Sequence, residues 1–222
     1  HIIKKAHEFN AIVLVDGAQA TPHMKIDVID LNVDFYVTST HKICGPTGVG
    51  ILYGKEKWLN KIPPFLGGGE MIDQVTFEKS TYAGLPNKFE AGTPNISGVI
   101  ASGIGIDYLN SIGLEKIYAY ENELLEYATR ELLRIKGLKI YGFSAKKTSV
   151  ISFNVGNIHP YDIGSILDKF GIATRTGQLC AQPIMDYFKI PGTIRVSFSF
   201  YNTKEEIDEF IKALHKSILM LS

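Results

Sequence analysis

Three short apolar runs in the first 54 residues constrain the fold most strongly. The first runs without a break from Ala11 to Val15 and ends at Asp16, and the others read "DFYVTS" and "GVGILYG". Unbroken apolar runs of this length are typical of strands buried on both faces of a mostly parallel sheet. A helical spacing of apolar residues over 2–9 precedes the first run. The first half therefore predicts an α/β arrangement.

The beginning of the chain indicates a larger protein. Residue 1 is not Met, and no N-cap residue precedes the helix predicted over residues 2–9. We therefore expect the chain to start inside or just before a helix and to be part of a longer polypeptide.

Between residues 62 and 97 the chain is rich in Gly and Pro, and we predict a long irregular segment there, functional or mobile. Within it, the run "GGGEM" lacks the Lys-Ser/Thr and helix that a phosphate loop needs. We expect that run to serve backbone packing or an interface.

The second half changes character and predicts a smaller α+β domain. One helix should end at Gly113, and a strongly amphipathic helix should follow over 114–136. Its apolar face comprises Ile117, Leu124, Leu125, Ala128, Leu132 and Ile135. Strands are expected at 138–142, 148–155, 172–176 and 193–200, with helices at 160–170 and after 202. We place the division between residues 104 and 105.

Composition excludes several classes of protein. The 23 Lys and Arg residues balance 23 Asp and Glu residues, so no overall charge favours nucleic acid or an anionic membrane. No apolar stretch approaches the roughly 18 residues of a membrane span. The two cysteines form no disulfide framework, and no Cys/His cluster has metal-ligand spacing. These features favour a reducing, cytoplasmic setting and no metal site.

A carboxylate and an amine follow neighbouring strands. Asp16 ends the first run, and Lys42 follows the second, with Gln19, Ser39 and His41 close in sequence. Ligands of open α/β sheets bind beyond the carboxyl ends of strands. Taken alone, Asp16 has the alternative role of capping the turn after the strand. An isolated Lys42 would be an ordinary surface residue.

The combination indicates a specific chemistry. A lysine amine in a dry cleft bonds covalently to aldehydes, and a carboxylate keeps a pyridine nitrogen protonated so that the ring withdraws electrons. The strand ends are therefore suited to an aldehyde-bearing pyridine cofactor.

Four motifs then identify a resemblance. "VDGAQA", "STHKICGPTGVGILYG", "FEAGTPN" and "RTGQLCAQPIM" resemble the class V aminotransferase-like cysteine desulfurases, closest to the SufS type (group II), which includes selenocysteine lyases. The resemblance covers all 222 residues but only the C-terminal half of a family member. It implies the fold type I of transferases that depend on pyridoxal 5′-phosphate (PLP).

The resemblance also implies residue roles. Lys42 matches the lysine that bonds to the cofactor and then moves the substrate Cα proton; Asp16 matches the partner of the pyridine nitrogen, and Gln19 that of the phenolic oxygen. Ser39 and His41 match phosphate contacts, and His41 is also a candidate catalytic residue. Thr93 matches a residue that reaches the phosphate of the other subunit in a homodimer. Arg195 matches the arginine that pairs with the substrate carboxylate, with Arg175 nearby.

Cys180 matches the nucleophile that accepts sulfur. From the residues alone, a free cysteine is more often a small buried apolar group. The surrounding "RTGQLCAQP" is polar and reads as a short loop able to stabilise a thiolate. Cys44, in the turn after Lys42, has no matching family role, and we expect it to be structural.

The resemblance implies conversion of L-cysteine to L-alanine, with a persulfide left on Cys180. The sulfur would pass to an acceptor of the SufE or SufU type for iron–sulfur cluster assembly. Two alternatives stay open: a lyase acting on L-selenocysteine, and a catalytically incomplete fragment or interaction module. The chain as it stands is expected to bind PLP weakly.

Overall fold

The computed structural model describes residues 1–144 and 146–222 and divides into two compact units, His1–Leu114 and Glu115–Ser222. Each unit is described by itself. The division predicted between residues 104 and 105 falls inside helix α4 (Ile96–Ile112), which lies wholly in the first unit.

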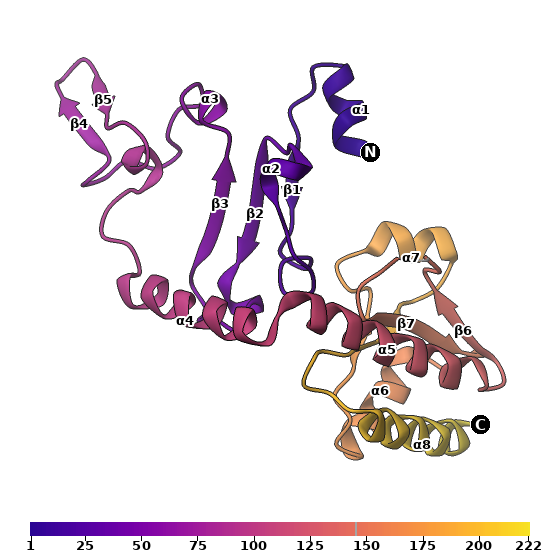
Figure 1. The fold of residues 1–222 in the computed structure, drawn as a ribbon. Helices are drawn as coiled ribbons and strands as arrows, with labels where there is room; N and C mark the ends of the chain where they lie inside the picture. The colour runs from indigo at the N-terminus through magenta and orange to yellow at the C-terminus, as the bar shows by residue number, and fades with distance from the viewer. Residues whose placement is uncertain (145) are drawn as a thin grey trace. The chain divides into compact units, whose positions relative to one another are not determined.

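The first unit is built on a three-stranded sheet of order β1-β2-β3 (Figure 1). Its strands are β1 (Leu14–Asp16), β2 (Phe35–Ser39) and β3 (Gly50–Gly54), at the three predicted apolar runs. β1 and β2 are parallel, with Asp16 opposite Val37, whereas β2 and β3 are antiparallel. Short helices lie at α1 (Ile2–Glu8), α2 (Val28–Leu31), η1 (Thr40–Lys42) and α3 (Glu56–Leu59). The predicted α/β arrangement is confirmed, with a mixed sheet.

The prediction that these strands are buried on both faces is wrong for the described residues. Leu14 is 57% exposed, and Leu52 on β3 is 50% exposed. β1 and β3 are the edge strands, and the described residues supply neither a further strand beside them nor enough helix to cover both faces. The unbroken apolar runs therefore predict where the strands lie but not how far they are buried.

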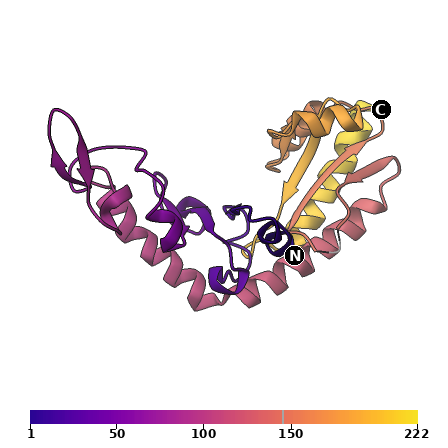
Figure 2. The same cartoon turned by 90° about the horizontal axis from the view of Figure 1, so that it is seen from above.

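The segment predicted to be irregular contains a hairpin. Strands β4 (Ile72–Val75) and β5 (Ser80–Tyr82) pair antiparallel, and a short helix η2 (Asn87–Phe89) follows. Both views place the hairpin beyond β3, away from β1 (Figure 1 and Figure 2). Most of its side chains are exposed on both faces, so the sequence carries no apolar alternation that would signal it.

The glycine-rich run before the hairpin packs backbone against backbone, as predicted. The Gly92 N–H donates to the Gly69 carbonyl at 2.9 Å, and a Cβ on Gly68 would lie 3.2 Å from the Gly92 nitrogen. These contacts hold the run against the segment that carries Thr93.

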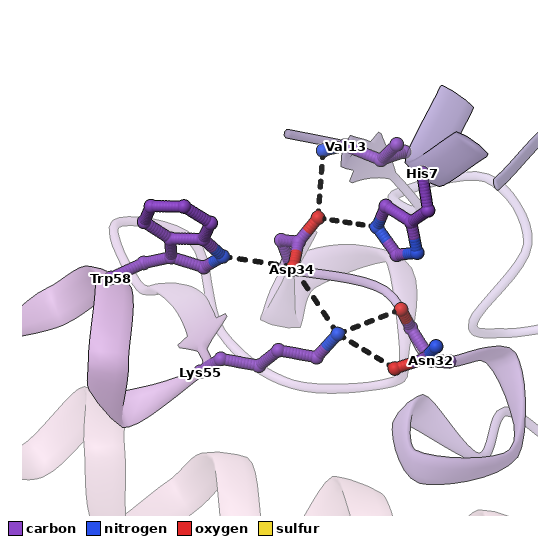
Figure 3. Close-up of polar contacts among 6 residues, drawn as sticks. All are labelled: His7, Val13, Asn32, Asp34, Lys55 and Trp58. Carbon is purple, nitrogen blue, oxygen red and sulfur yellow. Dashed lines mark hydrogen bonds and ion pairs between the residues drawn. The ribbon is translucent and has the colours of Figure 1, made fainter. Parts of the chain in front are cut away.

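A buried carboxylate, Asp34, ties the first unit together at the start of β2. Its Oδ2 accepts a hydrogen bond from the Val13 N–H at 3.0 Å and lies 2.7 Å from His7 Nε2 (Figure 3). Its Oδ1 accepts from Trp58 Nε1 at 2.9 Å and from Lys55 Nζ at 3.2 Å. The Asp34 side chain is only 3% exposed. One carboxylate thus joins α1, the chain before β1, the end of β3 and α3.

The surroundings of Asp34 make its effect on stability depend on pH. Burial alone raises the pKa of Asp34, but the hydrogen bonds from Val13, His7, Trp58 and Lys55 outweigh burial and hold that pKa well below its usual range. A carboxyl whose pKa is lower in the folded state stabilises fully above the unfolded value of about 4. That stabilisation is lost as the pH falls further.

Replacing Asp34 by alanine should lower the free energy of unfolding of this unit by about 3–5 kcal/mol, because the three groups on Val13, His7 and Trp58 lose their partner. Lys55 also loses its carboxylate partner and keeps only its hydrogen bonds to Asn32. Urea unfolding followed by the fluorescence of Trp58, the only tryptophan of the chain, measures the loss. Asp30→Ala, at an exposed position on α2, is the matched control and should cost less than about 0.5 kcal/mol. Equal effects of the two substitutions would contradict a central role for Asp34.

The second unit is an antiparallel four-stranded sheet of order β6-β7-β9-β8. Its strands are β6 (Leu138–Tyr141), β7 (Val150–Val155), β8 (Arg175–Gly177) and β9 (Thr193–Ser197). Its helices are α5 (Leu114–Leu133), α6 (Pro160–Lys169), α7 (Gln182–Phe188) and α8 (Lys204–Leu221). The predicted α+β unit is present. β8 starts three residues later than predicted, at Arg175 rather than Ile172, and α7 was not predicted.

One face of this sheet carries the core. The six predicted apolar residues from Ile117 to Ile135 are all buried, although Ile135 lies beyond the end of α5. From Leu124 onward they join a cluster with residues of β6, β7, β9, α6 and α8. α8 opens with a capping box in which Thr203 and Glu206 exchange hydrogen bonds with each other's backbone. The opposite face carries polar side chains, among them Ser152, Asn154 and Arg195.

Candidate active site

Five of the six predicted cofactor residues of the first unit, all except Thr93, lie at or just after the carboxyl ends of β1 and β2. Because β1 and β2 are parallel and Asp16 lies opposite Val37, the carboxyl ends of both strands lie at the same edge of the sheet. Ser39 ends β2, and His41 and Lys42 follow directly in η1. Lys42 is half-buried, whereas His41 is exposed.

Asp16 combines both roles considered for it. Its Oδ1 accepts a hydrogen bond from the Ala18 N–H at 3.0 Å, which caps the turn after β1. Among the described residues nothing is seen to bond its Oδ2, and the side chain is exposed. One oxygen therefore orients the carboxylate while the other stays open to a ligand. Gln19 lies exposed in the same turn.

The backbone after Asp16 requires glycine. A Cβ on Gly17 would lie 1.8 Å from the Tyr36 hydroxyl, an impossible contact. The Gly17 carbonyl accepts from Thr21 Oγ1 at 2.8 Å, and Thr21 Oγ1 lies 2.9 Å from the Tyr36 hydroxyl. The turn that carries Gln19 is thereby fastened onto β2.

A buried threonine holds the Lys42 turn. Thr40 Oγ1 donates to the carbonyls of Pro46 at 2.8 Å and Val49 at 3.2 Å, and the Thr40 carbonyl accepts from the N–H groups of Ile43 and Gly45 at 2.9 Å. Sequence reasoning passed over Thr40, although its place between Ser39 and His41 was a usable signal. We call these four hydrogen bonds the Thr40 clamp. They fix the position from which the Lys42 side chain leaves the backbone.

Helix α4 packs directly on this turn. A Cβ on Gly105 would lie 2.8 Å from the carbonyl carbon of Cys44, so only glycine permits the approach. At the other end of the contact, a Cβ on Gly48 would lie 3.4 Å from Asn95 Nδ2, at the N-cap of α4. Thr93, two residues before that cap, is exposed.

In the second unit, two arginines lie side by side on the polar face of the sheet. The register places Arg175 directly opposite Arg195, and Ser152 flanks Arg195 from β7. Arg195 Nε is buried and has no hydrogen-bond partner among the described residues. Adjacent like charges repel each other, so this pair is suited to binding an anion. The planar guanidinium group of an arginine is suited to a carboxylate, with which it forms two parallel hydrogen bonds.

Cys180 lies in the turn between β8 and α7 and is exposed. Leu179 and Cys180 both have left-handed backbone, with φ of 54° and 60°. The predicted short loop is confirmed in length, since Gln182 already begins α7. Desolvation raises the pKa of the Cys44 thiol, which lowers its thiolate fraction and its reactivity.

The chemistry of the first-unit donors fits a pyridine aldehyde phosphate. The edge offers an amine, a carboxylate, an amide and a hydroxyl, and the Thr38 hydroxyl on β2 is buried without a partner among the described residues. No group of three or more His, Cys, Asp or Glu side chains suited to a metal is found within the described ranges. No helix over those residues is long and apolar enough to cross a membrane.

Comparison with known proteins identifies the family. The sequence profile of the class-V aminotransferases matches residues 1–210. The chain belongs to this family. A cysteine desulfurase of Cronobacter sakazakii is 50% identical over 214 residues, which are 96% of this chain and 52% of that protein. A probable cysteine desulfurase of Streptomyces coelicolor is 48% identical over 215 residues, 96% of this chain and 51% of its own length. The chain thus spans about half the length of these class-V relatives.

Solved structures of related enzymes agree with the fold. The cysteine desulfurase CsdA of Escherichia coli matches with a TM-score of 0.93 and 37% identity, over 99% of this chain and 55% of that protein. A C-DES variant with glycine covalently linked to its PLP cofactor matches with a TM-score of 0.77 and 26% identity, over 92% of this chain and 51% of that protein. The predicted fold type I transferase architecture is confirmed.

Proposed function

We propose that the protein to which this chain belongs is a PLP-dependent cysteine desulfurase of the SufS type. The observation that supports the proposal is that Asp16 ends β1 and Lys42 follows β2, two parallel strands that pair with each other. The 48–50% identity to proteins named cysteine desulfurases or probable cysteine desulfurases supports the same activity.

The first unit would hold the cofactor. Lys42 would bond to its aldehyde carbon, Asp16 would pair with its ring nitrogen, and Gln19 would contact its phenolic oxygen. Ser39 and His41 would contact its phosphate. Bound PLP supplies an electron sink that stabilises negative charge at the substrate Cα. The Thr40 clamp would keep the Lys42 amine in place to take the proton from that carbon.

The second unit would bind the amino acid and accept its sulfur. Arg195 would pair with the carboxylate of L-cysteine through two parallel hydrogen bonds, and Arg175 would add positive charge beside it. The Cys180 thiolate would attack the substrate sulfur, so that the C–S bond breaks and an S–S bond forms on the enzyme. The carbon skeleton leaves as L-alanine, and the persulfide sulfur passes to an acceptor of the SufE or SufU type for iron–sulfur cluster assembly.

The proposed assembly is a homodimer, in which Thr93 would reach the phosphate bound by the neighbouring copy. Its exposure on the chain leading to α4 is compatible with that role. The cytoplasm is the proposed compartment.

Selenocysteine lyase activity is the second candidate. The Cys180 nucleophile matters less for that reaction, whereas Lys42 and Asp16 are still needed. Comparing the rates on L-cysteine and L-selenocysteine in a Cys180→Ala enzyme separates the two. A non-catalytic fragment is the third, and a PLP absorbance band in the purified protein would argue against it.

The substrate role of Arg195 gives a testable outcome. In the full-length enzyme, Arg195→Lys should raise the KM for L-cysteine about tenfold or more, because an ammonium cannot form the paired contact of the guanidinium. Steady-state kinetics measures the change, and kcat should fall less than kcat/KM. Arg134→Lys, at an exposed position in the turn just after α5, is the control. An unchanged KM in Arg195→Lys would remove this role.

A further inference from the structure

We infer that Asn154 is a positioning residue that holds the Cys180 turn in its reactive shape; the inference rests on the proposed sulfur transfer to Cys180. Asn154 lies in β7, on the polar face of the sheet, and is 9% exposed. Its Nδ2 donates to the Gly192 carbonyl at 2.9 Å. Nothing in the sequence motifs marks this residue.

Burying an amide at this position has a cost that needs a reason. Asn154 Oδ1 is buried and has no hydrogen-bond partner among the described residues. An unsatisfied buried polar atom costs about 1–3 kcal/mol. An apolar residue in this strand would avoid that cost, so the bond from Nδ2 to Gly192 is the contact that distinguishes asparagine here.

Gly192 transmits this contact to the next strand. It precedes β9 and lies so close to the end of β8 that a Cβ on Gly192 would be 2.7 Å from the carbonyl carbon of Gly177. Gly177 pairs with Thr193 and is the last residue before the turn. The position of the Gly192 backbone therefore sets where the Cys180 turn begins.

The turn itself is strained and needs such support. Leu179 and Cys180 are consecutive non-glycine residues with positive φ, and Gly177 has a φ of 108°. Each left-handed non-glycine residue costs about 1–2 kcal/mol. Within the turn, one backbone hydrogen bond is found among the described residues, from the Ala181 N–H to the Gln178 carbonyl at 2.9 Å. The contacts from Asn154 to Gly192 and from Gly192 to Gly177 support the turn from outside.

The test compares three variants of the full-length holoenzyme. Asn154→Ala removes the hydrogen bond, and Gly192→Ala keeps the asparagine but forces Gly192 away from Gly177. Asn157→Ala, an exposed asparagine just after β7, is the matched control. Hydrogen exchange of the amides in residues 178–182 is measured beside that of the α8 core, together with kcat and KM for L-cysteine.

Asn154→Ala and Gly192→Ala should each speed amide exchange in residues 178–182 about tenfold, because a tenfold change corresponds to the loss of roughly one net hydrogen bond. Exchange in α8 should change little. Both variants should also lower kcat about tenfold with KM unchanged, since Arg195 is untouched. Unchanged exchange in the turn, acceleration spread evenly over α8, or an unchanged kcat would each overturn the inference. If the wild-type enzyme releases no sulfur from cysteine, the proposed function fails, while the exchange data still decide whether Asn154 holds the turn.

Discussion

In the full-length enzyme, Lys42→Ala is expected to lower the rate of alanine formation from L-cysteine at least about a thousandfold. General acid–base catalysis alone contributes up to about four orders of magnitude, and the lost covalent link to the cofactor adds to that. The half-buried Lys42 follows Thr40, whose side chain and carbonyl make four hydrogen bonds within the same turn. We find no second lysine in this turn, which spans residues 40–50.

Lys25→Ala is the control for this result. Lys25 is exposed, in the chain before α2, and is the nearest lysine upstream of Lys42. Its replacement should leave alanine formation within twofold of wild type (an approximate bound for a surface change). Residual activity of Lys42→Ala near that of the control would contradict the assignment of the base.

Cys180→Ser should stop sulfur release from L-cysteine while leaving cofactor binding and the KM for cysteine nearly unchanged. A hydroxyl is a weak nucleophile toward sulfur, whereas a thiolate is well suited to this exchange. We expect sulfide formation to fall at least about a hundredfold. Alkylation of the wild-type enzyme after addition of cysteine, followed by peptide mapping, should find the persulfide on Cys180.

Cys44→Ser is the matched control because the chain has two cysteines and both are exposed and free. Desolvation raises the pKa of the Cys44 thiol, which lowers its thiolate fraction at neutral pH. Sulfide release should therefore persist in Cys44→Ser. A persulfide mapped to Cys44 would reverse the roles of the two residues.

Local patterns were sufficient to predict the parts of the fold that carry strong periodicity. The apolar runs around Val15 and Val37 predicted β1 and β2, and their polar ends placed Asp16 and Lys42 at one edge. The spacing of the apolar residues from Ile117 to Leu132 predicted both α5 and its buried face. In each case the signal lies within about twenty neighbouring residues, where periodicity is informative.

Features set by pairing between distant segments were not predictable. The hairpin of β4 and β5 has most of its side chains exposed, and α7 buries only Met185, so neither gives an apolar pattern. The pairing of Arg175 with Arg195 depends on the register of two strands that α7 separates in the sequence, as does the contact of Gly192 with Gly177. Sequence motifs named both arginines but gave no reason for their adjacency.

The identity of the lysine that bonds to PLP tests the central claim most directly. Borohydride reduction of the full-length enzyme loaded with PLP, followed by peptide mapping, reports the attachment site without depending on turnover. We predict a single adduct on Lys42 in wild type and in Cys180→Ser, and no adduct at this position in Lys42→Ala. An adduct on any other lysine of the wild-type enzyme, or none at all, would contradict the account.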